Sequence, residues 1–188
     1  MPTTKVTIVY YSQTGTVAAM ASRLAQTAEA QGAEVRLRSV GRDNDEVTEG
    51  EPARPTADDI VWADVVLFGS PTRYGNVAGR LKVFLDSLGA QWAQGQLADK
   101  VYAGFTSSQT AHGGQETTLL ALYNTIHHFG GLIVSPGYTD GSKFVDGNPY
   151  GVSHVTGPGN DIPLDDVANT ALDHLITRAI GISRRLTA

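Results

Sequence analysis

Short apolar runs alternate with segments of helical periodicity along nearly the whole chain, and this alternation constrains the fold more than any other feature. Residues 6–11, 64–69 and 101–106 are strongly apolar, residues 34–40 alternate between apolar and polar, and residues 132–134 form a shorter run. These patterns predict five strands. Helices are predicted between them and after the last one, because apolar residues recur there at spacings of three and four.

The predicted helices carry recognisable end signals. The first ends before Gly32, a short one opens with a capping-box pattern at 56–59, and the next has Asn76 as its expected N-cap. A helix over residues 115–129 follows, and the last one is expected to begin at Pro163. Strands alternating with helices imply right-handed βαβ units around a parallel sheet.

Two longer segments fit neither pattern. Residues 41–55 are charged and contain proline and glycine, and residues 137–160 are rich in glycine, asparagine and proline. Both are predicted as loops. Structureless loops beyond about 12–15 residues are uncommon in compact domains, so the length of the second one favours a role in framing a ligand site.

The expected architecture is a flavodoxin-like three-layer α/β fold. It has a five-stranded parallel sheet in the order 2-1-3-4-5, with helices on both faces. The 188 residues suit one domain spanning residues 1–188. Ligands in such sheets bind at the carboxyl ends of the strands, beside the first strand. The site is therefore expected in the loops 12–16, 70–76 and 107–114.

Composition excludes several classes of partner. The net charge of −5 leaves no basic footprint for nucleic acid. No apolar run approaches the roughly 20 residues that cross a bilayer, and the first residues lack the apolar core of a signal peptide. The chain has no cysteine, which fits a reducing compartment, and a cytoplasmic protein without a membrane partner is expected. No spacing of histidine and carboxylate residues indicates a metal site.

The first loop has the chemistry of a phosphate site. Ser12, Thr14 and Thr16 offer hydroxyls, and Gly15 lets the backbone curl ahead of a helix N-terminus. Such a turn binds phosphate without a cation. The P-loop pattern and the dinucleotide fingerprint are absent, which favours a phosphate that is held and not cleaved. The alternative is an ordinary capped turn between a strand and a helix.

The other two loops suit a planar group. The second loop offers backbone groups, the cation of Arg73 and the aromatic ring of Tyr74. Alternatively, Arg73 is a solvated surface charge and Tyr74 is a packing residue. The third is rich in small polar residues and ends in Gly113 and Gly114; alternatively it is a flexible connector. Together the three loops predict a pocket for a phosphorylated flat ligand, for which FMN is the candidate.

No residue is nominated as a catalytic acid, base or nucleophile. Ser107 or Ser108 could be paired with a histidine as in a hydrolase, but neither lies in a G-x-S-x-G turn. His127 and His128 lie near a predicted helix end, where histidines commonly interact with carbonyl groups.

The sequence resembles the WrbA-type NAD(P)H:quinone oxidoreductases, which are FMN proteins of flavodoxin-like fold. The matching stretches follow the family's order over nearly the whole chain: VYYSQTGT, FGSPTRYGNVAGRLKVFLD, WAQGQLADK, GGQETTLLALYNTIHH and GNPYGVSHVTGPG. The SPTRYGN and GNPYG pieces are specific, whereas SQTGT is shared by many flavodoxin-like proteins.

The resemblance implies the cofactor contacts. The FMN phosphate would lie on the first loop, at Ser12, Gln13, Thr14, Gly15, Thr16 and Val17. The second loop would lie beside the isoalloxazine ring, with Pro71, Thr72, Arg73, Tyr74 and Gly75. The third loop would complete the ring and ribityl contacts, with Ser107, Ser108, Gln109, Thr110, Gly113 and Gly114.

The resemblance also implies contacts between subunits. In this family the aromatic residue matching Trp92 faces the flavin of another subunit, and the assembly is a homotetramer, which makes Trp92 a substrate-site residue. The family also places a flavin-contacting histidine at the end of the helix before the fifth strand. Matched without a gap, that position is Phe129, with His128 one residue earlier, so either His128 takes the role through a local shift or the contact is lost.

The main hypothesis is therefore an FMN-dependent enzyme that reduces quinones by two electrons at the expense of NAD(P)H. The cofactor carries out this chemistry, and the protein binds and orients the cofactor and the substrates. Two alternatives stay open at this point. One is a flavodoxin-type carrier of single electrons that docks to redox proteins, and the other is a signalling domain without a ligand.

Overall fold

The strands form a single parallel sheet in this computed structural model, which describes residues 3–41 and 50–187. The order is β2-β1-β3-β4-β5, and a sixth strand, β6, also pairs with β4. The strands are β1 (Lys5–Tyr10), β2 (Glu34–Ser39), β3 (Val65–Pro71), β4 (Val101–Ser108), β5 (Leu132–Ile133) and β6 (Val152–Val155). The predicted order is confirmed, with one strand more than expected.

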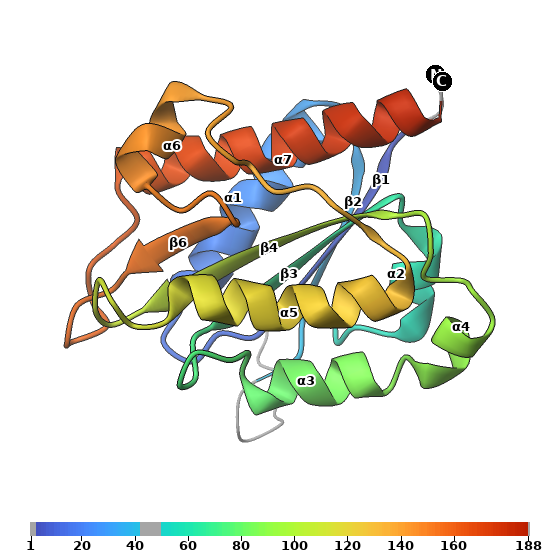
Figure 1. Cartoon of the computed structure of the whole chain (residues 1–188), viewed down its shortest axis with the longest axis horizontal. Helices are drawn as coiled ribbons and strands as arrows, with labels where there is room; N and C mark the ends of the chain where they lie inside the picture. Colours follow the sequence, from blue (N-terminus) through green and yellow to red (C-terminus); the bar gives the residue numbers. More distant parts are fainter. Residues whose placement is uncertain (1–2, 42–49, 188) are drawn as a thin grey trace.

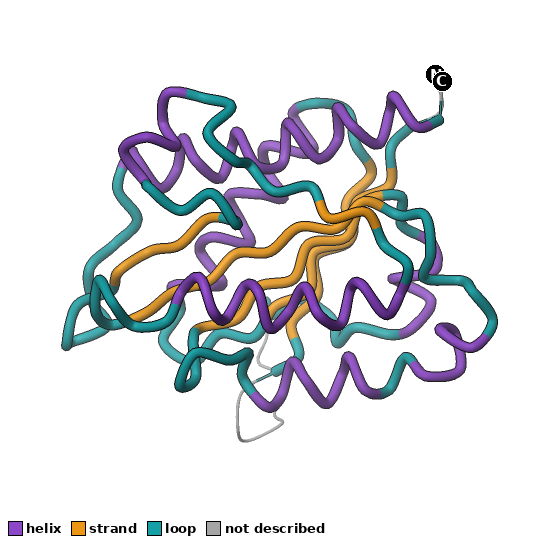
Figure 2. The backbone as a smooth tube through the Cα atoms, in the orientation of Figure 1, coloured by secondary structure: helices purple, strands orange, loops and turns teal. Residues whose placement is uncertain are grey.

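Helices cover both faces of the sheet (Figures 1 and 2). They are α1 (Thr16–Ala30), α2 (Ala57–Trp62), α3 (Gly79–Asp86), α4 (Gly89–Ala93), α5 (Gln115–Phe129), α6 (Gly141–Asp146) and α7 (Asp166–Leu186). Helices α1 and α7 pack on one face, and α2, α3 and α5 pack on the other. The result is the three-layer arrangement that the sequence predicts.

Successive residues of each central strand point to opposite faces of the sheet, so each strand contributes to two separate hydrophobic cores. Val65 and Leu67 of β3 point toward α1 and α7, whereas Val66 and Phe68 point toward α3 and α5. All four are fully buried. Burial of such a side chain is worth roughly 1.5–3 kcal/mol, so a strand that is apolar on both faces is fixed at the centre of the sheet.

The prediction of one long loop over residues 137–160 is wrong. This segment contains α6 and β6. Asp140 caps α6 by accepting a hydrogen bond of 2.9 Å from the Ser142 amide, and β6 pairs with residues 105–108 of β4. β5 pairs only with residues 101–102, so β6 fills the part of this sheet edge that β5 leaves open.

Two predicted helix starts are also wrong, while the capping box is confirmed. The N-cap of α3 is Ala78, because Asn76 is held in a backbone bridge with Arg73. Helix α7 begins after Asp165, whose carboxylate accepts a hydrogen bond of 2.7 Å from the Ala168 amide. Thr56 and Asp59 form the predicted capping box of α2.

Part of the predicted loop over residues 41–55 lies outside the described residues, at 42–49. In the part of the chain that the structure describes, no helix has the length and apolar character needed to cross a membrane.

Candidate functional site

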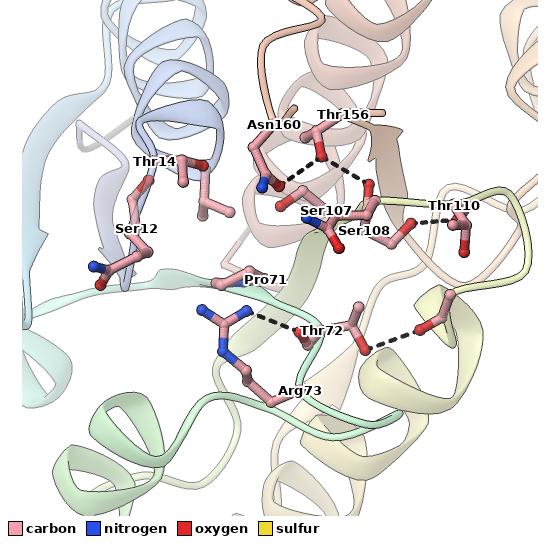
Figure 3. A pocket seen from close by; sticks show the side chains of 14 residues that line it. Ser12, Thr14, Pro71, Thr72, Arg73, Ser107, Ser108, Thr110, Thr156 and Asn160 are labelled. Carbon is pink, nitrogen blue, oxygen red and sulfur yellow. Dashed lines mark hydrogen bonds between the residues drawn. The ribbon is translucent and has the colours of Figure 1, made fainter. Parts of the chain in front are cut away.

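A cavity of about 390 Å³ opens where β1, β3 and β4 end, at the edge of the sheet that carries the three predicted loops (Figure 3). Its volume falls in the range of small-molecule sites. It is lined by Ser12, Gln13, Thr14, Val17, Pro71, Thr72, Arg73, Ser107, Ser108, Gln109, Thr110, Gly113, Thr156 and Asn160. The structure therefore brings together residues of all three loops.

The first loop presents an uncapped helix N-terminus. Gly15 is the N-cap of α1 with a φ of 101°, and no side chain caps the helix. The Ser12 hydroxyl accepts a hydrogen bond of 3.2 Å from the Gly15 amide instead. The first turn holds no acidic residue. Amide groups left open at the positive end of a helix dipole are suited to a phosphate.

The predicted phosphate residues divide between two adjoining hollows. Thr14 lines both the main cavity and its neighbour. Gly15 and Thr16 line only the neighbour, together with residues 160–164. The loop thus forms a wall that is accessible from two sides.

The second loop is a tight turn that holds Arg73. The amides and carbonyls of Arg73 and Asn76 exchange hydrogen bonds of 2.8 and 3.1 Å. Tyr74 and Gly75, at the tip, both have positive φ values, 55° and 78°, as in a type I′ turn. The side chain of Tyr74 is fully exposed and does not line the cavity. Arg73 lies on the cavity wall (Figure 3), where its guanidinium donates a bond of 3.1 Å to the Thr72 carbonyl.

Threonine hydroxyls join the second loop to the third. The Thr118 hydroxyl, on α5, lies 2.8 Å from the hydroxyl of Thr72 and 2.8 Å from the carbonyl oxygen of Gly114. The Thr72 hydroxyl also lies 3.3 Å from the Gly113 carbonyl oxygen. These bonds fix the position of Thr72, which lines the cavity.

Gly75 and Gly114 lie where the second and third loops approach each other. Gly114 has a φ of 91°, and a Cβ atom there would lie 2.9 Å from the Cα atom of Gly75. The two backbones therefore touch at a point where no side chain fits, which explains the glycines. Neither residue lines the cavity.

Thr156 and Asn160 line the cavity although the sequence analysis did not single them out. Thr156 follows β6 and donates a bond of 3.1 Å from its hydroxyl to the Ser108 carbonyl; the same hydroxyl lies 3.0 Å from the Asn160 side-chain oxygen. The sequence offered only a weak signal, because the four residues before them, Val-Ser-His-Val at 152–155, do not form an apolar run.

Among the described residues that line the cavity, Arg73 is the one with an ionisable side chain. The other polar groups that these described residues offer are hydroxyls, amides and backbone groups, with no carboxylate among them. In the described ranges, 3–41 and 50–187, no cluster of three or more histidine, aspartate or glutamate residues could hold a metal ion.

A model of the family described as NADPH-dependent FMN reductase matches residues 4–143. The chain belongs to this family. It is 39% identical to an NAD(P)H dehydrogenase (quinone) of Deinococcus radiodurans, over 97% of this chain and 96% of that protein. A second protein of that name, from Sinorhizobium fredii, is 40% identical over 81% of this chain and 83% of its own.

Solved structures agree on the fold. A WrbA-like flavodoxin from Agrobacterium tumefaciens has a TM-score of 0.73 at 24% identity, with 97% of this chain and 99% of that chain covered. A flavodoxin from Fusobacterium nucleatum, solved with flavin mononucleotide, has a TM-score of 0.61 at 15% identity, with 95% and 98% covered. The resemblance to the WrbA type and the flavodoxin-like fold are both confirmed.

The residues of the cavity fit FMN. The open amides of α1 and the hydroxyls beside them suit its phosphate, and the polar walls of the second and third loops, with Arg73 as their charged side chain, suit its polar flat ring. The donor set thus agrees with the cofactor of the family.

Trp92 and His128 do not line this cavity. The Trp92 indole nitrogen donates a bond of 2.6 Å to the His128 carbonyl oxygen, joining α4 to the end of α5. Gln115, beside the cavity, begins this helix, and His128 lies 13 residues further along it, which is about 20 Å at a rise of 1.5 Å per residue. Figure 1 shows α4 at the opposite end of the sheet from the third loop. Phe129, the other match for the flavin-contacting histidine, is buried in the core below α5.

Proposed function

We propose that this protein is an FMN-dependent NAD(P)H:quinone oxidoreductase that reduces quinones by two electrons. The observation that carries the proposal is the start of α1, which is uncapped by side chains and opens beside a cavity lined by neutral polar groups and one arginine, Arg73. Family membership and relatives named NAD(P)H dehydrogenase (quinone) support the redox activity.

The first loop, in this proposal, holds the FMN phosphate. The open amides at the start of α1 and the hydroxyls of Ser12 and Thr14 are the donors. Thr72 and Arg73 lie beside the ring, and the third loop closes the opposite wall. Thr156 and Asn160 join the set because they line the same cavity.

In this proposal the residues of the protein bind and orient the cofactor and its substrates. When bound, FMN would supply the redox chemistry, hydride acceptance from the nicotinamide and two-electron donation to the quinone, while the residues of the three loops would hold it. The lining residues within 3–41 and 50–187 include no carboxylate or histidine, so none of their side chains is assigned to proton transfer. The proton needed by the reduced quinone comes from solvent in this proposal.

The proposal includes a homotetramer in which Trp92 of one subunit faces the cavity of another. The support is its position: Trp92 is 51% exposed and lies far from the cavity of its own chain. His128 would approach the neighbouring site with it. A cytoplasmic location is also part of the proposal, supported by the absence of cysteine from the sequence.

Anaerobic titration of the FMN-loaded protein tests the activity. NADH or NADPH should bleach the flavin absorbance in one step, and benzoquinone should restore it. A protein that neither nucleotide reduces, and whose dithionite titration passes through a separate stable spectrum midway, would instead be a carrier of single electrons.

A further inference from the structure

A buried amide lies beside the third loop, at the start of α5. Gln115 is 4% exposed and does not line the cavity. Its side-chain nitrogen donates hydrogen bonds of 3.1 Å to two carbonyl oxygens of the loop, those of Thr110 and Ala111. The reverse orientation of the amide would place an oxygen against both carbonyl oxygens, so this pair of acceptors fixes which end of the amide faces the loop.

The third loop has few other internal hydrogen bonds. Residues 109–112 are exposed. The Thr110 carbonyl also accepts bonds of 2.7 Å from the Ser108 hydroxyl and 3.1 Å from the Gly113 amide. Among the described residues, the Ala111 carbonyl accepts only the bond from Gln115. Gln115 therefore holds the two peptide units on either side of Ala111.

These two bonds also fix the direction of two backbone amides. In a planar trans peptide the C=O and N–H groups point in opposite directions. The carbonyls of Thr110 and Ala111 face Gln115, so the amides of Ala111 and His112 point away from it. Neither amide donates a hydrogen bond to another residue that the structure describes. Thr110 and Gly113, on either side of them, line the cavity, so two free donors lie on the part of the loop that borders it.

The other end of the Gln115 amide is costly to the fold. Its side-chain oxygen is buried and, within residues 3–41 and 50–187, no group donates a hydrogen bond to it. A buried acceptor without a donor lowers the stability of the folded chain. An apolar side chain of the same length would fill this space without that loss. What a glutamine adds here is therefore the conformation that its nitrogen gives to the third loop.

We propose that Gln115 is a positioning residue that gives the third loop its binding conformation before FMN arrives. By turning two carbonyls toward itself, it leaves the amides of Ala111 and His112 as donors for the carbonyl groups of the flavin ring. A loop that is already ordered binds more tightly, because its ordering does not oppose the binding step. This inference rests on the proposed function, which places the ring beside the third loop.

Gln115→Met tests the assignment, because methionine has a similar length, donates no hydrogen bond and leaves no unpaired oxygen. The dissociation constant of FMN, measured by fluorescence titration of the apoprotein, should rise about tenfold. The urea midpoint of the apoprotein should not fall, because the variant loses the bonds to Thr110 and Ala111 but also the unpaired oxygen. Gln31→Met is the matched control. The Gln31 amide donates a bond of 2.6 Å to Thr177 at the opposite end of α1 from the cavity, so this variant should bind FMN as the wild type does.

Riboflavin separates the ring from the phosphate, because it carries the same ring and no phosphate. Gln115→Met should weaken riboflavin binding by the same factor as FMN binding, since the third loop is assigned to the ring. An unchanged FMN affinity, a loss confined to FMN, or a urea midpoint that falls together with the affinity would overturn the inference. These measurements need no turnover. A protein that reduces no quinone would refute the proposed function, and the flavin affinities would still decide the role of Gln115.

Discussion

The Trp92 indole donates a 2.6 Å hydrogen bond to the backbone carbonyl of His128, and 51% of the Trp92 side chain is nevertheless exposed. The bond fixes the orientation of a large aromatic ring whose outer face is open to solvent. Fixed and partly exposed tryptophans are enriched at protein interfaces, where they supply large contact areas at little entropic cost.

We expect Trp92→Ala to weaken assembly of the tetramer. Loss of a buried interface tryptophan raises a dissociation constant by roughly tenfold or more. Trp92→Phe keeps an aromatic face and loses the bond to His128, so it should have the smaller effect. Sedimentation of the wild type at micromolar concentration, with FMN present, provides the baseline. A 19.9 kDa species alone in that baseline run would contradict the tetramer.

The same variant should impair quinone turnover more than FMN affinity. Trp92 lies away from the cavity of its own chain, so the cofactor keeps all contacts within that chain. The quinone loses the aromatic wall that a neighbouring subunit supplies in the proposed assembly. Turnover with benzoquinone and fluorescence titration of FMN measure the two effects separately. Equal losses in both would argue against a wall from another subunit.

Thr14→Ala should weaken FMN binding about tenfold or more. A hydrogen bond to a charged group is worth about 1.5–3 kcal/mol, and Thr14 lies at the wall assigned to the phosphate. Thr170→Ala is the control, because its hydroxyl bonds only within α7, to the Asp166 carbonyl. Riboflavin, which lacks the phosphate, should bind the wild type far more weakly than FMN. Equal affinities for the two flavins would contradict the assignment of the phosphate site to the first loop.

Gly114→Ala should lower both stability and FMN affinity. The residue has a φ of 91°, and the new Cβ would lie 2.9 Å from the Gly75 Cα. A non-glycine residue in this conformation costs about 1–3 kcal/mol, and the crowding adds to that. Gly181→Ala is the opposite case: the position lies inside α7 with open space around it, so stability should rise by up to about 1 kcal/mol. Urea unfolding measures both, and a neutral Gly114→Ala would contradict the close approach of the two loops.

Asp59 should make the stability depend on pH on the acid side. Burial alone would raise the pKa of this carboxyl, but hydrogen bonds from Arg38 and Thr56 outweigh it and lower the pKa below its usual value. A carboxyl with a lowered folded pKa stabilises the protein above its unfolded pKa of about 3.9, and this contribution is lost as pH falls through the folded value. The free energy of unfolding should therefore fall below about pH 4.

Asp59→Asn isolates this contribution. We expect a loss of about 2–3 kcal/mol at pH 7, because the charged bonds from Arg36 and Arg38 lose their charged acceptor, and a flatter pH dependence below pH 4. Asp58→Asn is the matched control, an exposed aspartate one residue earlier in α2. Chemical unfolding at several pH values compares them. The same acid slope in both variants would assign the effect to other carboxylates.

The strands of the sheet could be predicted from the sequence because β1, β3 and β4 are apolar over a whole run, β2 alternates between apolar and polar residues, and each long helix has a clear period. β6 could not, since four residues, Val152–Val155, in a segment rich in glycine and proline carry too little pattern. Its stability comes from pairing with β4, a long-range contact that no local pattern encodes.

The site was predictable where polar residues directly follow a strong strand, as at Ser12, Thr72 and Ser107. Thr156 and Asn160 were missed because the strand before them was missed. Asn76 was misread as a helix cap because the turn that places Tyr74 and Gly75 at its tip is closed by backbone bonds, and side-chain preference does not report these.

The fifth position of the sheet is occupied by two short strands in series, β5 beside residues 101–102 and β6 beside residues 105–108 of β4. The covalent path between them leaves the sheet and returns through α6, so no continuous strand runs along this edge. A change in the geometry of β5 is therefore not transmitted along a continuous strand to Thr156 at the cavity rim. The two ends of the edge can diverge in sequence and geometry independently, and a change in the length of the connection through α6 need not alter the register of either strand.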